Sequence, residues 1–331
     1  MTHKISYSSI ETFEQCSEKW RLKYQEKLVS SRINSPLFFG SALDEAFSYL
    51  LLRKKTELTE NELTLLTTKT VYDVFDQFMK NQEGKDLATN PDVEYSANDF
   101  DPDFLKAEDL KNLKKFDSEI TDHYSFYEEC RESVKAKKKL SSQDQKLFNY
   151  MNWLSLYNKG LMLIQAYEKE VLPKIKEVFD IQKQVHLENS SGDVIRGKID
   201  FIASFVDDPD TKVICDNKTA SKAYLEDSVA KSMQLSIYCE SEELEKAAYV
   251  VVEKQVRKKE PKVRINIIKD TVMEESFESA FQKVDSALQL IHSNAFEKKA
   301  DKKECWFFGK KCEYFGVCWF NDFTGITRKE K

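Results

Sequence analysis

The sequence predicts an α/β fold in which helices cover the faces of a sheet, and three observations favour it. Glycine and proline number only 8 and 6 among 331 residues, which disfavours a loop-rich β-sandwich. Hydrophobic residues make up 41% of the chain and charged residues 33%, so we expect a core inside a polar, helix-rich surface. From residue 178 onward, short β-branched runs alternate with helical patterns, and this order indicates a sheet packed against helices.

Two helices are expected at the start of the chain. Residues 8–27 carry apolar side chains at spacings of three and four, and Ser8 with Glu11 has the form of a capping box. Cys16 lies on the apolar stripe of this helix. A second helix is expected over residues 42–52, directly after the tripeptide FFG.

A long helical region separates these helices from the expected strands. Residues 56–172 read as a helical insertion, because leucine, valine and aromatic residues recur there with helical spacing. The stretch 90–109 is acidic and less regular, and we expect a loop there. Residues 178–187, 193–206 and 212–217 then read as strands, separated by the turn signals SSGD and DDPD.

The remaining segments complete the expected sheet and its cover. Residues 224–240 return to helical spacing, strands are expected at 247–253 and 263–268, and a helix is expected over 272–297. A cysteine-rich tail follows. We therefore divide the chain into N-terminal core helices, helical insertion, sheet-bearing core and tail, at residues 1–55, 56–172, 173–297 and 298–331.

The charge distribution bears on possible partners. A net charge of −6 does not by itself recommend nucleic-acid binding, which normally leaves a basic footprint. Charge acts locally, however, and seven basic residues lie between Lys254 and Lys269, with further basic runs over 135–139 and around the terminal cysteines. Each run, taken alone, is more typical of a solvated surface.

The compartment follows from the absence of apolar segments and from the cysteines. No run reaches transmembrane length and the N-terminal residues are polar, so we expect a cytoplasmic protein with no membrane partner. Structural disulfides are rare there, so seven cysteines need another explanation. Cys130, Cys215 and Cys239 stand in apolar or amphipathic contexts and are expected in the core. The absence of a P-loop and of a dinucleotide glycine fingerprint disfavours an ATP-driven motor.

Two carboxylates and a lysine lie on neighbouring expected strands. Asp200 ends the run GKID, and Asp216 and Lys218 stand in DNK at the end of the next strand. Residues two apart on a strand point the same way, so Asp216 and Lys218 can share a site, which Asp200 reaches if the strands form a hairpin. Paired carboxylates suit Mg²⁺ or Mn²⁺, and a lysine can orient water or neutralise a phosphate. These residues predict phosphodiester hydrolysis, although ordinary strand-end carboxylates produce the same short patterns.

The segments GKIDFIASF and KVICDNKTA resemble motifs II and III of the PD-(D/E)XK nuclease superfamily and of its RecB-like exonuclease branch. The following QLSIY is similar to the Q-x-x-x-Y motif of that branch, and YSSIETFEQCSEKWRLKY is similar to its opening helix. The nuclease domains of AddB-type helicase–nucleases and the CRISPR-adaptation exonucleases share this pattern. The resemblance covers residues 5–52 and 178–320, and implies a restriction-endonuclease-like mixed central sheet flanked by helices.

The resemblance implies a role for each residue of the two strands. Asp200 and Asp216 would be ligands of the divalent metal, and Asn217 would add its backbone carbonyl. Lys218 would be the catalytic lysine. Local lysines and aromatic residues would line the path of the substrate DNA.

Two further positions carry implied roles. Gln234 and Tyr238 would contact the DNA backbone or orient the site, with a plain core position as the alternative for Tyr238. Motif I of the branch usually has a histidine ligand, and Asp44 takes that position in FFGSALDEAF. Aspartate can also ligate Mg²⁺ or Mn²⁺. Glu45 is the alternative ligand, but on a helix it points about 100° away from Asp44.

The tail run CWFFGKKCEYFGVC resembles the last three cysteines of the branch, which bind an iron–sulfur cluster. The spacing before the second cysteine is longer here than the usual C-x-x-C. Four thiolates can hold [4Fe–4S] or zinc, and we favour the cluster because the paired spacing typical of zinc is missing. Four buried free cysteines are the alternative. The cluster would join the two termini through Cys16, Cys305, Cys312 and Cys318.

These features together predict a Mg²⁺- or Mn²⁺-dependent DNA exonuclease acting on single-stranded DNA or DNA ends. Recombination, repair or viral DNA processing would be its setting, with a helicase or recombination protein as a possible partner. The alternative is a catalytically weak module that binds DNA or a helicase, which Asp44 and the acidic net charge favour. A sequence-specific endonuclease is a third reading, disfavoured by the cysteine tail and Q-x-x-x-Y.

Overall fold

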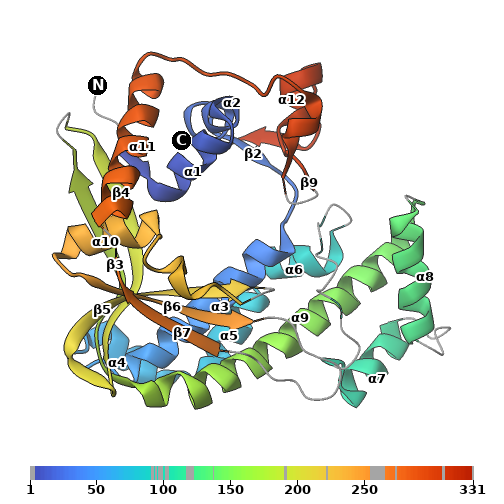
Figure 1. The fold of residues 1–331 in the computed structure, drawn as a ribbon. Coiled ribbons are helices and arrows are strands. Elements are labelled where there is room, and N and C mark those ends of the chain that lie inside the picture. The colour runs from blue at the N-terminus through green and yellow to red at the C-terminus, as the bar shows by residue number, and fades with distance from the viewer. Residues whose placement is uncertain are drawn as a thin grey trace.

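A mixed six-stranded sheet forms the centre of the molecule (Figure 1). The computed structural model describes residues 4–90, 93, 95, 100, 104–116, 123–136, 138–189, 192–220, 223–253, 265–272, 274–307 and 310–329. The strand order is β1-β4-β5-β6-β7, with β3 paired to β4. The strands are β1 (Lys4–Ser6), β3 (Ile175–Glu188), β4 (Val194–Phe205), β5 (Asp208–Ala220), β6 (Lys246–Glu253) and β7 (Ile265–Thr271).

The strand directions confirm an α/β fold with a mixed sheet. Strand β4 runs antiparallel to β3 and β5, β6 runs antiparallel to β7, and the pairs β1–β4 and β5–β6 are parallel. The pairing of β4 with β5 is the hairpin expected between GKID and DNK. Residues 194–196 of β4 pair with β3 on one side and with β1 on the other. Further along β4, strand β5 takes the place of β1 on that other side.

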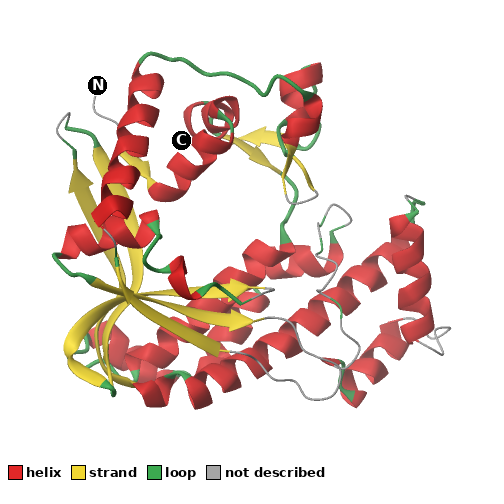
Figure 2. Ribbon diagram, viewed as in Figure 1, coloured by secondary structure: helices red, strands yellow, loops and turns green. Residues whose placement is uncertain are grey.

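Both faces of the sheet are buried, because side chains of each strand alternate between two cores. Along β6, the residues Ala248, Val250 and Val252 belong to one core, and their odd-numbered neighbours belong to the other. Helices cover both faces (Figure 2). The first face carries α3 (Ser35–Leu52), α5 (Val71–Met79), α6 (Gln82–Thr89) and α9 (Ser142–Glu170), and the second carries α1 (Tyr7–Gln15), α10 (Met233–Glu242) and α11 (Glu274–His292).

The region 56–172 is helical over most of its described residues. It adds α4 (Glu60–Thr68), α7 (Ala107–Phe116) and α8 (His123–Lys135) to the helices named above. The loop expected over 90–109 ends by Ala107, where α7 begins, and part of it lies outside the described residues. The division of the chain into four segments stays a prediction.

The start of the first helix differs from the sequence expectation. The cap is Ser6, whose hydroxyl accepts a hydrogen bond from the backbone N–H of Ser9 at 3.2 Å, and it is not Ser8. Ser6 also ends β1 and pairs with Arg196. Residues 4–6 are therefore a strand that leads directly into α1, which the short run KIS did not reveal.

The first helix also breaks at Cys16, where a single helix over 8–27 was expected. Cys16 has extended backbone angles, and α2 (Ser17–Trp20) and a π-helical turn (Arg21–Gln25) follow it. The reason is tertiary, because Glu297 supplies hydrogen bonds to this turn. The Ser17 hydroxyl and the Glu18 N–H both donate to the Glu297 carbonyl oxygen, at 3.2 Å each.

Two further helices begin at other residues than expected. The helix α3 starts at Ser35, because Asn34 caps it and Pro36 stands in its first turn. The helix expected from residue 224 starts at Met233, where the Ser232 hydroxyl accepts from a backbone N–H. In both cases the cap residue decides the boundary, and the apolar pattern does not.

The C-terminal tail packs against the N-terminal segment (Figure 1). Strand β10 (Ile326–Arg328) pairs antiparallel with β2 (Leu28–Ser30), and the hydroxyl of Tyr314 donates to the Leu28 carbonyl at 2.7 Å. A small core of Leu22, Leu28 and Tyr314 lies beneath this pairing. The tail also contains β8 (Trp306–Phe307), β9 (Lys310–Lys311) and α12 (Phe315–Phe320).

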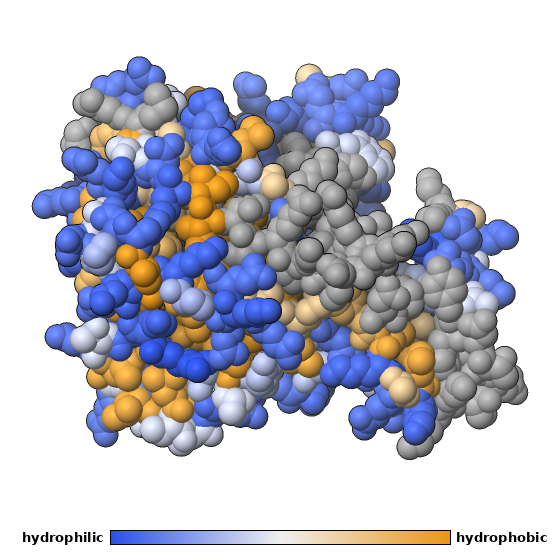
Figure 3. Space-filling view, turned by 60° about the horizontal axis from the view of Figure 1, so that its bottom comes forward, coloured by the Kyte–Doolittle hydropathy of each residue, from blue (hydrophilic) through white to orange (hydrophobic). Residues whose placement is uncertain are grey.

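On the face shown in Figure 3, hydrophobic patches lie between hydrophilic residues. Most of the basic run 254–269 lies outside the described residues. Its last member, Lys269, forms an ion pair with Asp207 at 2.6 Å. Among the described residues, no helix combines the length and the apolar character needed to cross a membrane.

Candidate active site

The hairpin of β4 and β5 brings the predicted carboxylates together. Phe201 pairs with Cys215, so Asp200 and Asp216 are the next residues along the two strands. The backbone N–H of Asn217 donates to Asp200 Oδ2 at 2.8 Å. Asp216 is only 3% exposed, so its carboxylate stands in a largely water-free position.

Lys218 and Gln234 extend this pair into a connected polar network. Lys218 Nζ lies 2.6 Å from Asp216 Oδ2 and 3.3 Å from Gln234 Oε1. The Gln234 amide donates to Asp216 Oδ1 at 3.4 Å and to the Tyr238 hydroxyl at 3.1 Å. Gln234 and Tyr238 are four residues apart on α10 and therefore share one face of it. The structure thus brings together four residues that the motifs singled out.

Tyr238 is buried, and its ring explains the glycine in GKID. A Cβ atom placed on Gly197 would lie 2.3 Å from Tyr238 Cε1 and 3.0 Å from Val185 Cγ2. Such contacts are too short for any larger side chain. Tyr238 therefore both packs in the core and supplies a hydroxyl to Gln234.

Asp44, on α3, lies within electrostatic range of Asp200 and Lys218, whereas Glu45 is exposed. The Gln182 amide lies 3.2 and 3.3 Å from the two carboxylate oxygens of Asp44, and 3.1 Å from the Ser48 hydroxyl. Gln182 has a φ of 54° inside strand β3, a left-handed conformation that costs energy for a residue with a side chain. No motif pointed to Gln182, and only the structure reveals that it orients Asp44.

The protein environment disfavours the ionised forms of the three carboxyl groups and raises their pKa values. Burial, together with repulsion from Asp216 and Asp44, raises the pKa of Asp200 to about 8. Burial also raises the pKa of Asp216, against the attraction of Lys218. Burial raises the pKa of Asp44 as well, against the attraction of Lys198, the hydrogen bond from Gln182 and the attraction of Lys218. Burial opposes the charge of Lys218, but attraction to Asp216 outweighs it and raises the pKa of Lys218. The lysine therefore remains an ammonium at neutral pH.

The donor set fits a hard divalent cation by its chemistry. Asp44, Asp200 and Asp216 offer carboxylate oxygens, which Mg²⁺ and Mn²⁺ prefer, and their mutual repulsion is what a bound cation would relieve. Among the described residues, however, no three His, Cys, Asp or Glu side chains converge closely enough to enclose a metal. The ion pair with Lys218 occupies part of the coordination space of Asp216.

Asn217, between the two charged residues of DNK, is held from the helical region. The Tyr167 hydroxyl on α9 donates to Asn217 Oδ1 at 3.0 Å. Tyr167 is fully buried and stacks on Phe47 with ring centroids 4.1 Å apart. The helix α9 therefore supports β5 directly, and α3 supports it through the stacked ring of Phe47. The role of the Asn217 carbonyl as a metal ligand stays a prediction.

The four cysteines of the predicted cluster gather in one region. Burial, Glu18 and the other three thiols raise the pKa of Cys318 to about 12, so all four lie within electrostatic range. Cys305 is buried, and the indole N–H of Trp319 donates to its sulfur at 3.4 Å. The backbone N–H of Cys312 donates to the Cys305 carbonyl at 2.7 Å. The described thiols do not form a closed metal cage.

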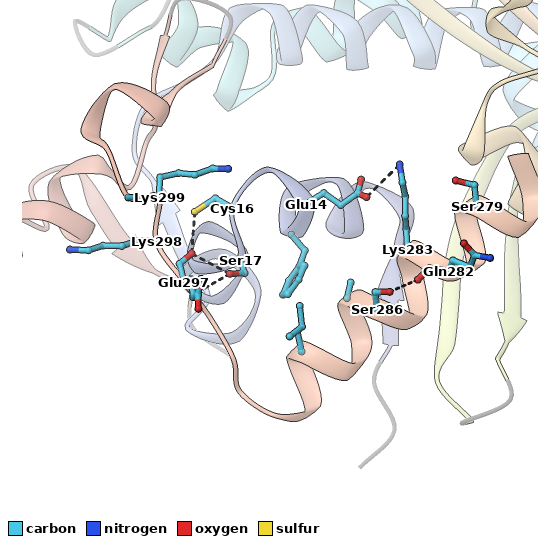
Figure 4. A pocket seen from close by; sticks show the side chains of 14 residues that line it. Glu14, Cys16, Ser17, Ser279, Gln282, Lys283, Ser286, Glu297, Lys298 and Lys299 are labelled. Atoms are coloured by element: carbon cyan, nitrogen blue, oxygen red, sulfur yellow. Dashed lines mark hydrogen bonds and ion pairs between the residues drawn. The ribbon is translucent and has the colours of Figure 1, made fainter.

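Cys16 lies on the wall of a cavity of about 700 Å³ between α1 and α11 (Figure 4). Its thiol donates to the Glu297 carbonyl at 3.8 Å. Across the cavity, Lys283 forms an ion pair with Glu14 at 3.5 Å. The other three cysteines, Cys130, Cys215 and Cys239, are buried in the core as expected.

Comparisons with known proteins place this geometry in a family. The sequence matches the PD-(D/E)XK nuclease superfamily over residues 4–96 and 108–319. No curated protein sequence matches it significantly. A solved structure titled "Crystal structure of SSO0001" is similar at 18% identity and a TM-score of 0.28. The similarity covers 42% of this chain and 59% of that one, and is too low to support an argument about fold or function.

The family match includes the hairpin of β4 and β5 and the helix α10, and therefore every catalytic residue predicted from the motifs. The mixed sheet flanked by helices is consistent with the restriction-endonuclease-like fold of the family. The chain belongs to the PD-(D/E)XK nuclease superfamily.

Proposed function

We propose that this chain is a Mg²⁺- or Mn²⁺-dependent DNA exonuclease of the RecB-like branch, which hydrolyses phosphodiester bonds on single-stranded DNA or at DNA ends. The observation that carries the proposal is the ion pair, at 2.6 Å, between the half-buried Lys218 and the buried Asp216, beside Asp200. A lysine and two carboxylates on adjacent strands match the chemical needs of this reaction.

Each residue of the site has a separate role in the proposed hydrolysis. Asp44, Asp200 and Asp216 would hold the divalent cation, which would polarise a phosphoryl oxygen and acidify a water molecule. Asp216 and Gln234 position the Lys218 ammonium. Because Lys218 stays charged, it stabilises negative charge that develops on the phosphate and does not act as the base.

A [4Fe–4S] cluster on Cys16, Cys305, Cys312 and Cys318 belongs to the same proposal. The electrostatic proximity of the four sulfurs supports it, and so does the N–H donor at Cys305. The cluster would act structurally, as a tie between the chain ends. Protein purified without oxygen should contain about four irons and as many sulfides per chain, whereas zinc, or neither metal, would contradict the cluster.

The biological setting belongs to the same proposal. A helicase or recombination partner, and a role in recombination, repair or viral DNA processing, follow from the RecB-like motifs alone. Cytoplasmic location stays a prediction.

The test of the active site is Lys218→Ala. We expect cleavage of a labelled single-stranded oligonucleotide with Mn²⁺ to fall by roughly 10²-fold or more, because one preorganised charge stabiliser is lost. Lys212→Ala is the matched control, since Lys212 is an exposed lysine on the same strand, and it should retain activity. Melting temperature and circular dichroism confirm that both variants fold. Retained cleavage in Lys218→Ala would contradict the assignment.

A second candidate is a catalytically weak module that binds DNA or a helicase. The carboxylates do not form a ready-made metal cage, and Asp44 replaces the usual histidine; both observations favour it. Calorimetric titration with Mn²⁺ separates the two candidates. An enzyme should bind Mn²⁺ in a manner that Asp216→Ala abolishes, whereas a binding module should take up DNA without metal uptake or cleavage.

A further inference from the structure

A second cavity, of about 460 Å³, opens directly beside the catalytic lysine. Lys218 and Gln234 are among its lining residues, and so are Arg196 and Lys198. Its volume falls in the range of small-ligand sites, about 300–1,000 Å³. The cavity therefore has room for a charged group together with the nucleotide that carries it.

The topology of the sheet builds this cavity. Strand β1 pairs with β4 so that Ser6 lies opposite Arg196, and α1 begins at the next residue. The first turn of α1 thus reaches the cavity, where Ser6 and Ser8 expose hydroxyls 3.1 Å apart. The N-terminal end of a helix carries partial positive charge, which adds to the charge of Arg196.

The charges around the cavity are predominantly positive. Arg196 and Lys198 are two residues apart on β4, are exposed, and form no ion pair within the described part of the chain. The one acidic residue of the wall, Glu11, accepts a hydrogen bond from Tyr7. Two unpaired cations, hydroxyl donors and a helix start are together the features of an anion site.

We propose that this cavity binds a phosphate group of the DNA strand that is being cleaved, next to the phosphodiester held at Lys218. The assignment rests on the proposed function, because the neighbouring Lys218 site fixes the ligand as nucleic acid. Phosphate suits Arg196, whose planar guanidinium forms two parallel hydrogen bonds to such oxygens.

The phosphate can come from either of two places on the strand. A terminal phosphate would let the enzyme select chain ends, because the cavity would hold the end while Lys218 faces the adjoining bond. An internal phosphate would only add affinity and set the register of the strand. Both share the same chemistry, and the choice of oligonucleotide distinguishes them.

The test measures binding without catalysis. Fluorescence anisotropy of a labelled single-stranded oligonucleotide in the presence of EDTA is recorded for Arg196→Gln over a range of salt concentrations. We expect affinity to fall roughly tenfold and the salt slope to decrease by about 0.7–1 unit, the contribution of one phosphate contact. Lys176→Gln, an exposed cation on β3, is the matched control and should leave both quantities unchanged.

The two phosphate sources give different patterns. If the loss is larger for a 5′- or 3′-phosphorylated oligonucleotide than for its hydroxyl-ended counterpart, the phosphate is terminal. If the loss is equal for all ends, the phosphate is internal. Arg196→Gln with wild-type affinity and salt slope would overturn the proposal.

The outcome is separable from the fate of the proposed function. Because the measurement requires neither metal nor cleavage, Arg196→Gln can weaken DNA binding even if no divalent ion ever supports hydrolysis. Conversely, if the protein cleaves DNA but Arg196→Gln leaves its DNA affinity unchanged, the nuclease assignment stands and the phosphate site is contradicted. Lys198→Gln provides a second variant, in case the loss of Arg196 impairs folding.

Discussion

The carboxylate–lysine site and the four-cysteine region are built in opposite ways. The first stands on long strands buried on both faces, where Asp216 is only 3% exposed and hydrogen bonds link it to α10. The second lies on short helical turns and the residues next to strands of two or three residues, over a core of three buried side chains. The sheet and the helices packed on it, α9 and α10, hold the first site in place through hydrogen bonds, whereas so small a core supplies little stabilisation to the second region.

The largest expected effect is on the catalytic side and concerns charge. Asp200→Asn removes a carboxylate whose folded pKa lies far above its unfolded value, but retains the acceptor for the Asn217 N–H. At about 1.4 kcal/mol per pKa unit, the relief has an upper bound of ~5 kcal/mol. We expect metal-free Asp200→Asn to be more stable than wild type at pH 8, although it cleaves no DNA.

The pH dependence of the free energy of unfolding tests whether the ionised Asp200 destabilises the fold. A carboxyl with a raised folded pKa favours folding fully at acidic pH, and this contribution is lost as pH rises from about 4 to about 8. Thermal unfolding in EDTA between pH 5 and 8.5 should show that loss in wild type and much less of it in Asp200→Asn. Asp210→Asn, an exposed position on β5, serves as control. Parallel curves for all three proteins would mean that Asp200 is not under strain.

The second prediction concerns the close packing of the carboxylate–lysine site around Gly197. Gly197→Ala would place a Cβ 2.3 Å from the Tyr238 ring, so we expect a loss of about 1–3 kcal/mol in unfolding free energy and reduced cleavage. Gly40→Ala is its matched control, because the nearest atom there, Thr219 Oγ1, lies 3.7 Å away. An alanine in this helix should add about 0.5–1 kcal/mol. Equal stabilities of the two variants, measured by urea denaturation, would contradict the close packing.

The smallest expected effect is the loss of a single tyrosine hydroxyl hydrogen bond, tested once in each region. Tyr314→Phe removes the hydrogen bond to Leu28, and Tyr167→Phe removes the one to Asn217. Each should cost about 1 kcal/mol, but in different places. Hydrogen exchange should accelerate at β2 and β10 in Tyr314→Phe with cleavage unchanged, whereas Tyr167→Phe should reduce cleavage. Identical exchange patterns in the two variants would show that the regions unfold as one unit.

The sequence was sufficient to predict those parts of the site whose residues lie close together along the chain. The hairpin with Asp200, Asp216 and Lys218 could be predicted because each motif lies on one strand and the turn between the strands is short. Gln234 and Tyr238 were singled out through the resemblance of QLSIY to the Q-x-x-x-Y motif, and their spacing of four places them on one face of α10. Along these stretches, neighbours in the sequence are also neighbours in the site.

The remaining features depend on partners that are distant in sequence. The helix breaks at Cys16 because of contacts to Glu297, 281 residues away. Strand β1 has three residues, too few for any periodicity, and Gln182 takes a left-handed conformation that no motif announces. The cavity at Arg196 exists only because β1 joins the edge of β4.

The pairing of β2 with β10 has a consequence for synthesis. Ser31 donates a hydrogen bond to Gly325, a residue 294 positions later, and at 5–20 residues per second the ribosome needs about 15–60 s to cover that distance. All strands of the central sheet have emerged once Thr271 has left the ribosome. The β4–β5 hairpin can therefore assemble on the nascent chain, whereas β2 finds its partner strand β10 only after the tail has been synthesised.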